Sequence, residues 1–139
     1  MLIYNNKPLT MKYLCFLLLI GASFTACKKE EGAHVDIIGK WKVSKTETTV
    51  AGTATVTYTG VAADSFEFRS NDGNEMVVNL NGASSIGSYY VLDNNNLRFN
   101  YNGKTRVGTI TTLSESKLEF TGTVEGTTPQ TTEKYYLTK

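Results

Sequence analysis

Apolar and polar residues alternate with a period of two from Ile37 to the end of the chain. Such alternation is typical of β-strands with one buried face and one face toward solvent. Thr, Val and Tyr, which favour strands, are frequent in these stretches, and no window of helical period interrupts them. The pattern predicts strands at residues 39–49, 53–59, 65–69, 75–80, 85–92, 97–101, 105–113, 117–123 and 133–138.

Short turn sequences separate the predicted strands and limit how they can be connected. Asn81-Gly82 and Asn102-Gly103, for example, supply the positive φ angles that tight hairpins need. Because every link has hairpin length, we expect an all-β fold: a single up-and-down antiparallel β-barrel of eight to nine strands. Closure removes the exposed edges of an open sheet. A Greek-key sandwich is the alternative, but it needs a longer crossover than residues 60–64 or 122–131 provide.

A different pattern occupies the N-terminus, where Lys12 precedes an apolar run at residues 14–26 that ends in small residues. This arrangement is typical of a cleaved secretory signal peptide. The run is shorter than the roughly 20 residues that a membrane-spanning helix needs. Translation can begin at Met1 or at Met11, and either start leaves the same mature chain.

Cys27 directly follows the small residues, and this junction resembles the lipobox of bacterial lipoproteins. In that family the cysteine sulfur receives a diacylglycerol, the preceding peptide is removed and the new N-terminus is acylated. The resemblance implies a signal peptide at 1–26, a lipidated cysteine with a flexible tether at 27–36, and the barrel at 37–139. The alternative is an ordinary signal peptide that leaves Cys27 as a free thiol. No disulfide is expected, because Cys15 lies in the removed segment.

The tether contains Lys28-Lys29-Glu30-Glu31, a charged run without an apolar period. It is either a plain solvated spacer or an address, since it resembles the export signal of surface lipoproteins of the Bacteroidota type. The second interpretation implies an outer-membrane protein that is held by the lipid on Cys27. Exposure at the cell surface and a periplasmic position both stay open.

Charge and residue content argue against several classes of function. Removal of residues 1–26 takes Lys7 and Lys12 with it, so 12 basic residues face 13 acidic ones and the net charge changes from +1 to −1. A near-neutral chain without a basic stripe is not expected to bind nucleic acid. The only histidine is His34 and the only remaining cysteine is Cys27, so we expect no metal site and no cofactor.

The first predicted strand carries a motif that resembles a known family. The segment Ile37-Ile38-Gly39-Lys40-Trp41-Lys42-Val43 is similar to the Gly-x-Trp opening of lipocalins and related calycins, and the later strands look like the small lipocalin-like domains of bacterial surface lipoproteins. The resemblance implies that Gly39 allows a close approach at the barrel floor and that Trp41 plugs that end beneath a basic side chain. Candidates for this basic partner are Arg106, Lys134 and Lys139. The chain lacks the Thr-Asp-Tyr motif of full lipocalins and any helix after the barrel.

An eight-stranded barrel is just wide enough to be filled by side chains or to hold one small ligand. Two interpretations therefore stay open. Either inward aromatic residues fill the barrel, or they line an apolar pocket with one open end while Trp41 closes the other. The candidate ligand-binding residues are Tyr58, Phe66, Phe68, Met76, Tyr89, Phe99, Tyr101, Phe120 and Tyr135.

Catalysis is not expected from the carboxylates on or near strands, which are Asp64, Glu67 and Glu119. Glu67 and Glu119 alternate with apolar residues and should point to solvent, and the sequence has neither a Gly-x-Ser-x-Gly motif nor a His/Cys dyad. The sequence thus predicts a lipid-anchored, lipocalin-like protein that binds a small apolar ligand. The alternative is a non-catalytic accessory module with a filled barrel, whose Thr-rich outer wall contacts a protein or glycan partner.

Overall fold

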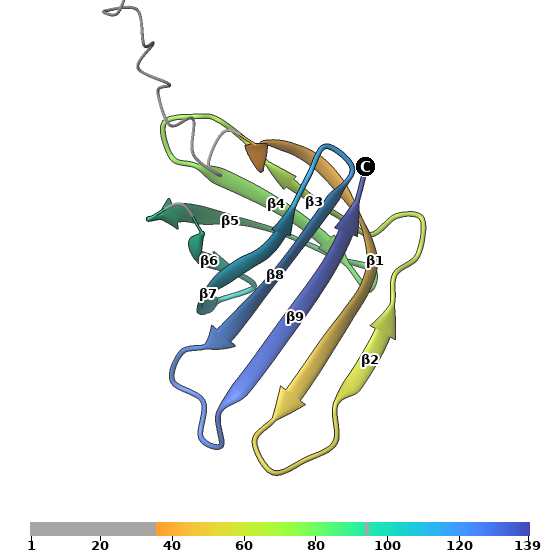
Figure 1. The fold of residues 1–139 in the computed structure, drawn as a ribbon, viewed down its shortest axis with the longest axis vertical. Helices are drawn as coiled ribbons and strands as arrows, with labels where there is room; N and C mark the ends of the chain where they lie inside the picture. Colours follow the sequence, from red (N-terminus) through yellow and green to blue (C-terminus); the bar gives the residue numbers. More distant parts are fainter. Residues whose placement is uncertain (1–35, 94) are drawn as a thin grey trace, which may run out of the picture. The chain divides into compact units, whose positions relative to one another are not determined.

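The computed structural model describes residues 36–93 and 95–139 of the chain (Figure 1). The predicted signal peptide, Cys27, His34 and most of the predicted tether lie outside the described residues. Within the described part of the chain, no helix has the length and apolar character needed to span a bilayer.

Each predicted strand is present in the structure, and most strand ends agree with the prediction within one or two residues. The largest difference is at the second strand, which begins at Val56 because the Thr53 amide donates to the Val50 carbonyl at 2.9 Å and closes a turn there. The strands are β1 (Gly39–Val50), β2 (Val56–Thr59), β3 (Ser65–Phe68), β4 (Glu75–Leu80), β5 (Ala83–Leu92), β6 (Asn96–Tyr101), β7 (Lys104–Leu113), β8 (Lys117–Val124) and β9 (Thr131–Thr138).

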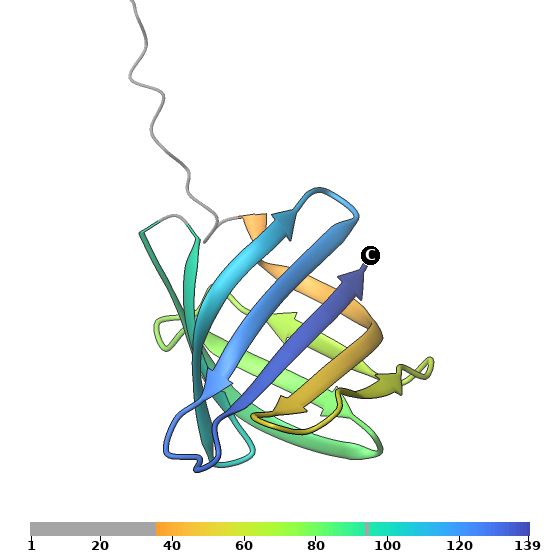
Figure 2. The same cartoon turned by 60° about the horizontal axis from the view of Figure 1, so that its bottom comes forward.

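The strands form one antiparallel sheet that closes on itself (Figures 1 and 2). β3 to β9 are neighbours in chain order, and β1 pairs with β3 on one side and with β9 on the other. Pairing of residues 42–50 of β1 with β9 joins the first strand to the last. The predicted up-and-down antiparallel barrel is therefore confirmed, with eight strands in the closed barrel.

β2 is an additional strand outside this closed barrel. One edge of β1 has two partners: β3 pairs with residues 39–42, and β2 pairs with residues 45–48. β1 has room for both because it is 12 residues long, whereas β3 has only 4 residues. β2 thus lies beside the C-terminal half of β1, as Figure 1 shows, and does not separate β1 from β3.

A β-bulge in β1 changes which of its residues face the interior. Trp41 and Val43 are buried, the register with β9 shifts between Val43 and Lys45, and the next buried residue is Thr46. An extra residue in one strand bends that strand and increases its twist. The bulge therefore helps a strand of this length to follow the curvature of a closed barrel.

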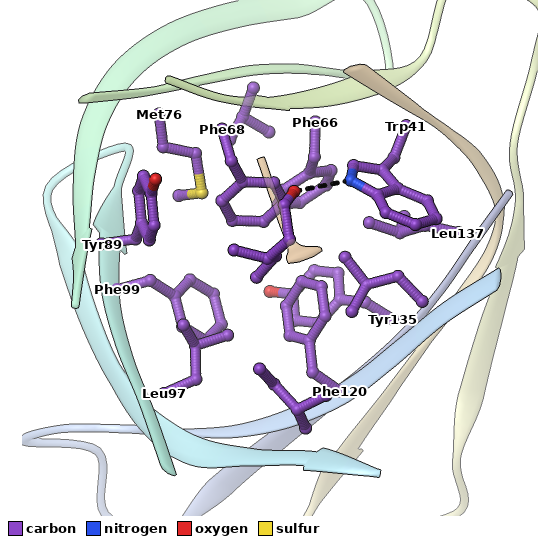
Figure 3. Close-up of a cluster of buried hydrophobic side chains, with 14 of the residues drawn as sticks. Trp41, Phe66, Phe68, Met76, Tyr89, Leu97, Phe99, Phe120, Tyr135 and Leu137 are labelled. Atoms are coloured by element: carbon purple, nitrogen blue, oxygen red, sulfur yellow. Dashed lines mark hydrogen bonds between the residues drawn. The ribbon is translucent and has the colours of Figure 1, made fainter. Parts of the chain in front are cut away.

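The barrel interior is a continuous cluster of apolar side chains (Figure 3). Along β8, for example, Leu118 and Phe120 are fully buried, whereas Lys117, the first residue of the strand, is exposed. The same alternation on β3 buries Phe66 and Phe68. The period of two in the sequence therefore places the apolar side chains in the core of the barrel. The two ends of the barrel differ in the side chains that border this core.

Candidate functional site

The first end of the barrel, called the Trp41 end below, lies where β1 begins and β9 finishes. Trp41 has no exposed surface, and its indole Nε1 donates a hydrogen bond to the Ile37 carbonyl at 2.8 Å, drawn as a dashed line in Figure 3. The Lys139 ammonium lies 4.3 Å from the centroid of the indole ring. Trp41 is therefore buried at this end of the barrel, with the basic side chain of Lys139 over its ring.

Lys139 is the partner among the three basic candidates. Arg106 instead lies 3.9 Å from the centroid of the Tyr101 ring, and the Lys134 ammonium lies 4.7 Å from the centroid of the Tyr136 ring. A cation over an aromatic face is attracted by the ring quadrupole. Each candidate is thus over an aromatic ring, but Lys139 is the one over Trp41.

Gly39 has a different role from the one implied by the resemblance. A Cβ atom built on Gly39 would meet only the flexible end of Lys139, at 3.9 Å, which is an ordinary van der Waals contact. Its φ angle is +119°, a backbone conformation that residues with a side chain rarely adopt. Glycine is therefore needed here for the path of the backbone into β1, and close approach of another element does not require it.

Eight of the nine candidate ligand-binding residues are buried, and they belong to the same apolar cluster as Trp41. The Phe120 and Tyr135 rings stack with centroids 4.7 Å apart, and the Phe99 ring meets the Phe120 ring edge-on at 5.3 Å. Figure 3 shows Phe66 and Phe68 reaching the centre from one wall and Phe120 and Tyr135 from the opposite wall. Side chains therefore occupy the central part of the barrel, where an apolar ligand would have to displace them.

Tyr58 is the candidate that the structure keeps apart from this cluster. It lies on β2, outside the closed barrel, and is half-buried. Its hydroxyl donates to Asp64 at 2.7 Å. The inward position expected for Tyr58 assumed that every strand is part of the barrel, and β2 is not.

The second end of the barrel, called the Arg106 end below, contains a buried ion pair. Arg106 on β7 is only 3% exposed, and its Nε donates to Glu133 on β9. Its Nη1 donates to the carbonyl oxygens of Tyr101 at 3.2 Å and Lys104 at 2.9 Å. Burial of the guanidinium would by itself lower the pKa of Arg106, but the hydrogen bond and charge of Glu133 raise it, so the guanidinium keeps its charge.

Two tyrosines extend this polar network into the core. The Tyr135 hydroxyl donates to Glu133, and the Tyr101 and Tyr135 hydroxyl oxygens are 2.8 Å apart. Because the Tyr135 proton is directed at Glu133, Tyr101 donates to Tyr135. Burial raises the pKa of Tyr101 and raises that of Tyr135 well above its ordinary value. Both phenols are therefore neutral donors at physiological pH.

Gly122 on β8 makes room for Arg106 inside the barrel. Gly122 faces inward, and a Cβ atom there would lie 2.9 Å from Phe99 Cζ and 3.1 Å from Arg106 Cβ. Contacts of that length require the neighbouring atoms to move. The absence of a side chain at this one inward position therefore lets a long charged side chain lie beside an aromatic ring.

A pocket of about 330 Å³ opens above this ion pair. Buried residues form its base, and strand ends and turns form its rim. It is lined by Val78, Leu80, Asn81, Ala83, Ser84, Ser85, Tyr101, Asn102, Lys104, Arg106 and Glu133. The pocket thus combines an apolar wall from β4 with a polar base from β7 and β9.

A larger hollow of about 460 Å³ lies at the Trp41 end, but it has a different character. Its lining includes the exposed residues Asp36, Ser114, Glu115 and Lys139. None of the described residues that are buried in the core lines it. The Arg106 end is therefore the candidate functional site, because there the pocket reaches residues of the core.

Sequence reasoning named Arg106 only as a candidate partner of Trp41 and did not name Glu133 as a site residue. On β7, Arg106 is buried, whereas the apolar residue next to it, Val107, is 44% exposed. Ile110 is buried, and residues two and four positions before it share its face. Glu133 shares the face of Tyr135 in the same way. The sequence signal that could have revealed the pair is that Arg106 and Glu133 both fall at positions that the alternation of their strands directs inward.

The carboxylates considered for catalysis lie elsewhere. Glu67 pairs with Arg69 at 2.9 Å and Glu119 pairs with Lys117 at 2.8 Å, both on the outer face as predicted. Asp64 is buried and accepts hydrogen bonds from Tyr58, from the Val61 amide at 2.9 Å and from the Asn81 amide at 3.0 Å. Burial would raise the pKa of Asp64, but these bonds hold it below its ordinary value. Residues 36–93 and 95–139 contain no cluster of three metal-ligating side chains.

Comparison with known protein families identifies a matching family. The sequence model of the lipocalin-like domain matches residues 37–120, a stretch that begins just before Trp41 and ends at Phe120 on β8. Arg106 lies inside the matched stretch and Glu133 lies beyond it. No curated protein matches the chain.

Proposed function

The chain belongs to the family of lipocalin-like domains, and on that premise we propose that it is a lipid-anchored protein of the cell envelope that binds a small, largely apolar molecule at the Arg106 end of its barrel. Binding involves no catalysis in this proposal. The ligand enters from the open end, lies against Val78 and Leu80, and meets the polar base of the pocket with its head group.

The pocket above Arg106 is the observation that carries this proposal. Its volume of about 330 Å³ lies within the range of roughly 300–1,000 Å³ that small-molecule sites occupy. Val78 and Arg106, which are 2% and 3% exposed, show that the pocket extends to the level of the core. Because the middle of the barrel is occupied by aromatic rings, the ligand is shorter than one that would fill a hollow barrel.

A substitution that fills the pocket tests this proposal. Ser85 lines the pocket, whereas Thr109 is exposed on β7 and does not line it. We expect calorimetric titration with a panel of small apolar compounds to give saturable binding by the wild type and by Thr109→Trp, and no binding by Ser85→Trp. Equal binding by Ser85→Trp and the wild type would place the ligand elsewhere.

The envelope anchor is the second part of the proposal and depends on Cys27, outside the described residues. Two or more acyl chains hold a protein stably at a membrane, whereas one chain does so only marginally. The lipobox-like junction and the charged run after Cys27 favour anchoring at the outer membrane. Cys27→Ser should move the protein from the membrane fraction to the soluble fraction, and unchanged fractionation would contradict lipidation.

An accessory module that contacts a protein or glycan partner is the second candidate function. Exposed apolar residues on the outer wall favour it, because Tyr90 on β5 and Val107 on β7 are 49% and 44% exposed and lie in register on either side of Arg98. If this function holds, no compound of the panel binds, and Tyr90→Glu abolishes co-purification of a defined partner with the barrel while Ser85→Trp does not.

A further inference from the structure

The pocket at the Arg106 end has a buried cation at its base that already has an anion from its own chain. Arg106 and Glu133 form an ion pair in which the Arg106 side chain is 4% exposed and the Glu133 side chain 16%. Glu133 contacts both Nε and Nη2 of the guanidinium. The Nε and Nη2 side of the guanidinium, which can bind a carboxylate through two hydrogen bonds, is therefore already occupied by Glu133.

The hydrogen-bonding capacity that remains at this base can be counted. A guanidinium has five N–H donors. Arg106 uses Nε and Nη2 for Glu133, and Nη1 for the carbonyl oxygens of Tyr101 and Lys104. Among the described residues this leaves one Nη2 donor without a partner. Glu133 Oε2 accepts from Arg106 and Tyr135, whereas Oε1 receives only the long contact from Nη2 at 3.5 Å.

The spare Nη2 donor of Arg106 lies beside the Oε1 acceptor of Glu133, and this pair matches a head group that can both accept and donate a hydrogen bond. A hydroxyl or a primary amide both donates and accepts, so it can bond to Nη2 and to Oε1 together. A carboxylate only accepts, and it would approach the negative charge of Glu133, whose side chain is mostly buried. Like charges at such a site cost free energy, and partner selection often depends on a repulsive element of this kind.

Lys104 is the other cation at the pocket, and it does not reverse this preference. Lys104 lines the rim and is exposed. Charges exposed to solvent are screened by salt and contribute little. Glu133 lies deeper, next to the position where a head group meets Arg106, so its charge has the larger effect on selectivity.

We propose that the pocket selects an uncharged polar head group, such as an alcohol or a primary amide on a short apolar chain, and that Glu133 is the specificity-determining residue that excludes carboxylates. This inference rests on the proposed function, since it names the class of ligand for the same pocket. Removing the charge of Glu133 while keeping its shape should release Arg106 to bind an anion.

Calorimetry with octan-1-ol, octanamide and octanoate tests the inference on the wild type, on Glu133→Gln and on a matched control. Glu125→Gln is the control, because Glu125 also pairs with an arginine, Arg98 at 3.2 Å, but on the exposed surface. We expect the wild type and Glu125→Gln to bind the alcohol and the amide at least about tenfold more tightly than the acid, a difference of about 1.4 kcal/mol. Glu133→Gln should bind octanoate at least about tenfold more tightly than the wild type does.

The possible results separate the two proposals. If the wild type binds octanoate as well as octan-1-ol, the selectivity is overturned while ligand binding at the pocket stands. If the wild type binds none of the three probes, ligand binding fails and the selectivity fails with it. A rise in melting temperature of Glu133→Gln with octanoate that is larger than the rise of the wild type with octanoate provides a second measurement, which does not require the variant to be as stable as the wild type.

Discussion

The two ends of the barrel interior bury very different groups. The Trp41 end contains an indole whose single donor is satisfied by one carbonyl, with the charge of Lys139 left outside over the ring. The Arg106 end has a full ion pair and two phenols inside the wall. Burial of an apolar ring stabilises a fold directly, whereas a buried ion pair often contributes little net stability. The comparison indicates that the Trp41 end contributes mainly to stability, whereas the groups buried at the Arg106 end are not explained by stability alone.

Loss of the indole should have the largest effect on stability. Trp41→Ala removes a fully buried ring and leaves a cavity under Lys139, so we expect it to lower the free energy of unfolding by about 3–5 kcal/mol. Urea denaturation followed by circular dichroism measures this change. A loss below about 1 kcal/mol would show that the Trp41 end contributes less than its burial indicates.

Breaking the ion pair at the other end should have the next largest effect. Arg106→Met leaves Glu133 without its cation, which should cost about 3 kcal/mol, the low end for such changes because Glu133 borders a pocket open to solvent. The double variant Arg106→Met with Glu133→Leu should be more stable than Arg106→Met alone. If the double variant is the less stable one, the pair is a net stabilising element and the contrast between the two ends is wrong.

A side chain at Gly122 should disturb the Arg106 end and leave the Trp41 end intact. Gly122→Val places atoms where Phe99 and Arg106 now lie, and overpacking of this kind costs about 1–3 kcal/mol. We expect the fluorescence of Trp41 to keep its native emission maximum while the melting temperature falls. A shifted emission maximum would show that the two ends are not independent.

Alkaline pH should weaken the Arg106 end. Burial raises the pKa of Tyr101 and Tyr135 above the ordinary value of 10.0, so the folded protein holds these protons more tightly than the unfolded chain does. Their contribution is therefore fully present below about pH 10 and is lost as the pH rises through the folded-state pKa values. Denaturation between pH 8 and 11 should show this fall, with a smaller slope for Tyr101→Phe combined with Tyr135→Phe. Equal slopes would contradict the assignment.

The cation over Trp41 should have the smallest effect. Lys139→Met removes the charge 4.3 Å from the indole centroid and keeps an apolar cover over the ring. We expect a loss of about 0.5–1 kcal/mol, the range for exposed cation–π contacts. Lys134→Met, which removes a cation over Tyr136 on the outer wall, is the matched control for general charge effects, and it should leave the fluorescence of Trp41 unchanged.

The sequence predicts the Trp41 end much better than the Arg106 end, for a physical reason. The strands and Trp41 follow from a local pattern, because a period of two and a Gly-x-Trp motif are read within one strand. The Arg106–Glu133 pair joins β7 to β9 across β8, so it depends on the curvature of the wall and not on neighbours in the chain. A bulge between Ile110 and Thr112 also interrupts the alternation on β7. Tyr58 was misplaced because pattern alone does not distinguish a strand of the barrel from one beside it.

Pairing of β1 with β9 has a consequence for how the chain folds. Residues 42–50 of β1 pair with residues 131–138 of β9. During synthesis from the N-terminus, this edge of β1 therefore stays unpaired until nearly the whole domain has been made. Contacts between distant residues form slowly, whereas the nearby β1–β2 hairpin can form early. β2 therefore gives the first strand a local partner during synthesis. A chain cut before β9 is an open sheet with unpaired edges, and completion of the last strand is the step that removes them.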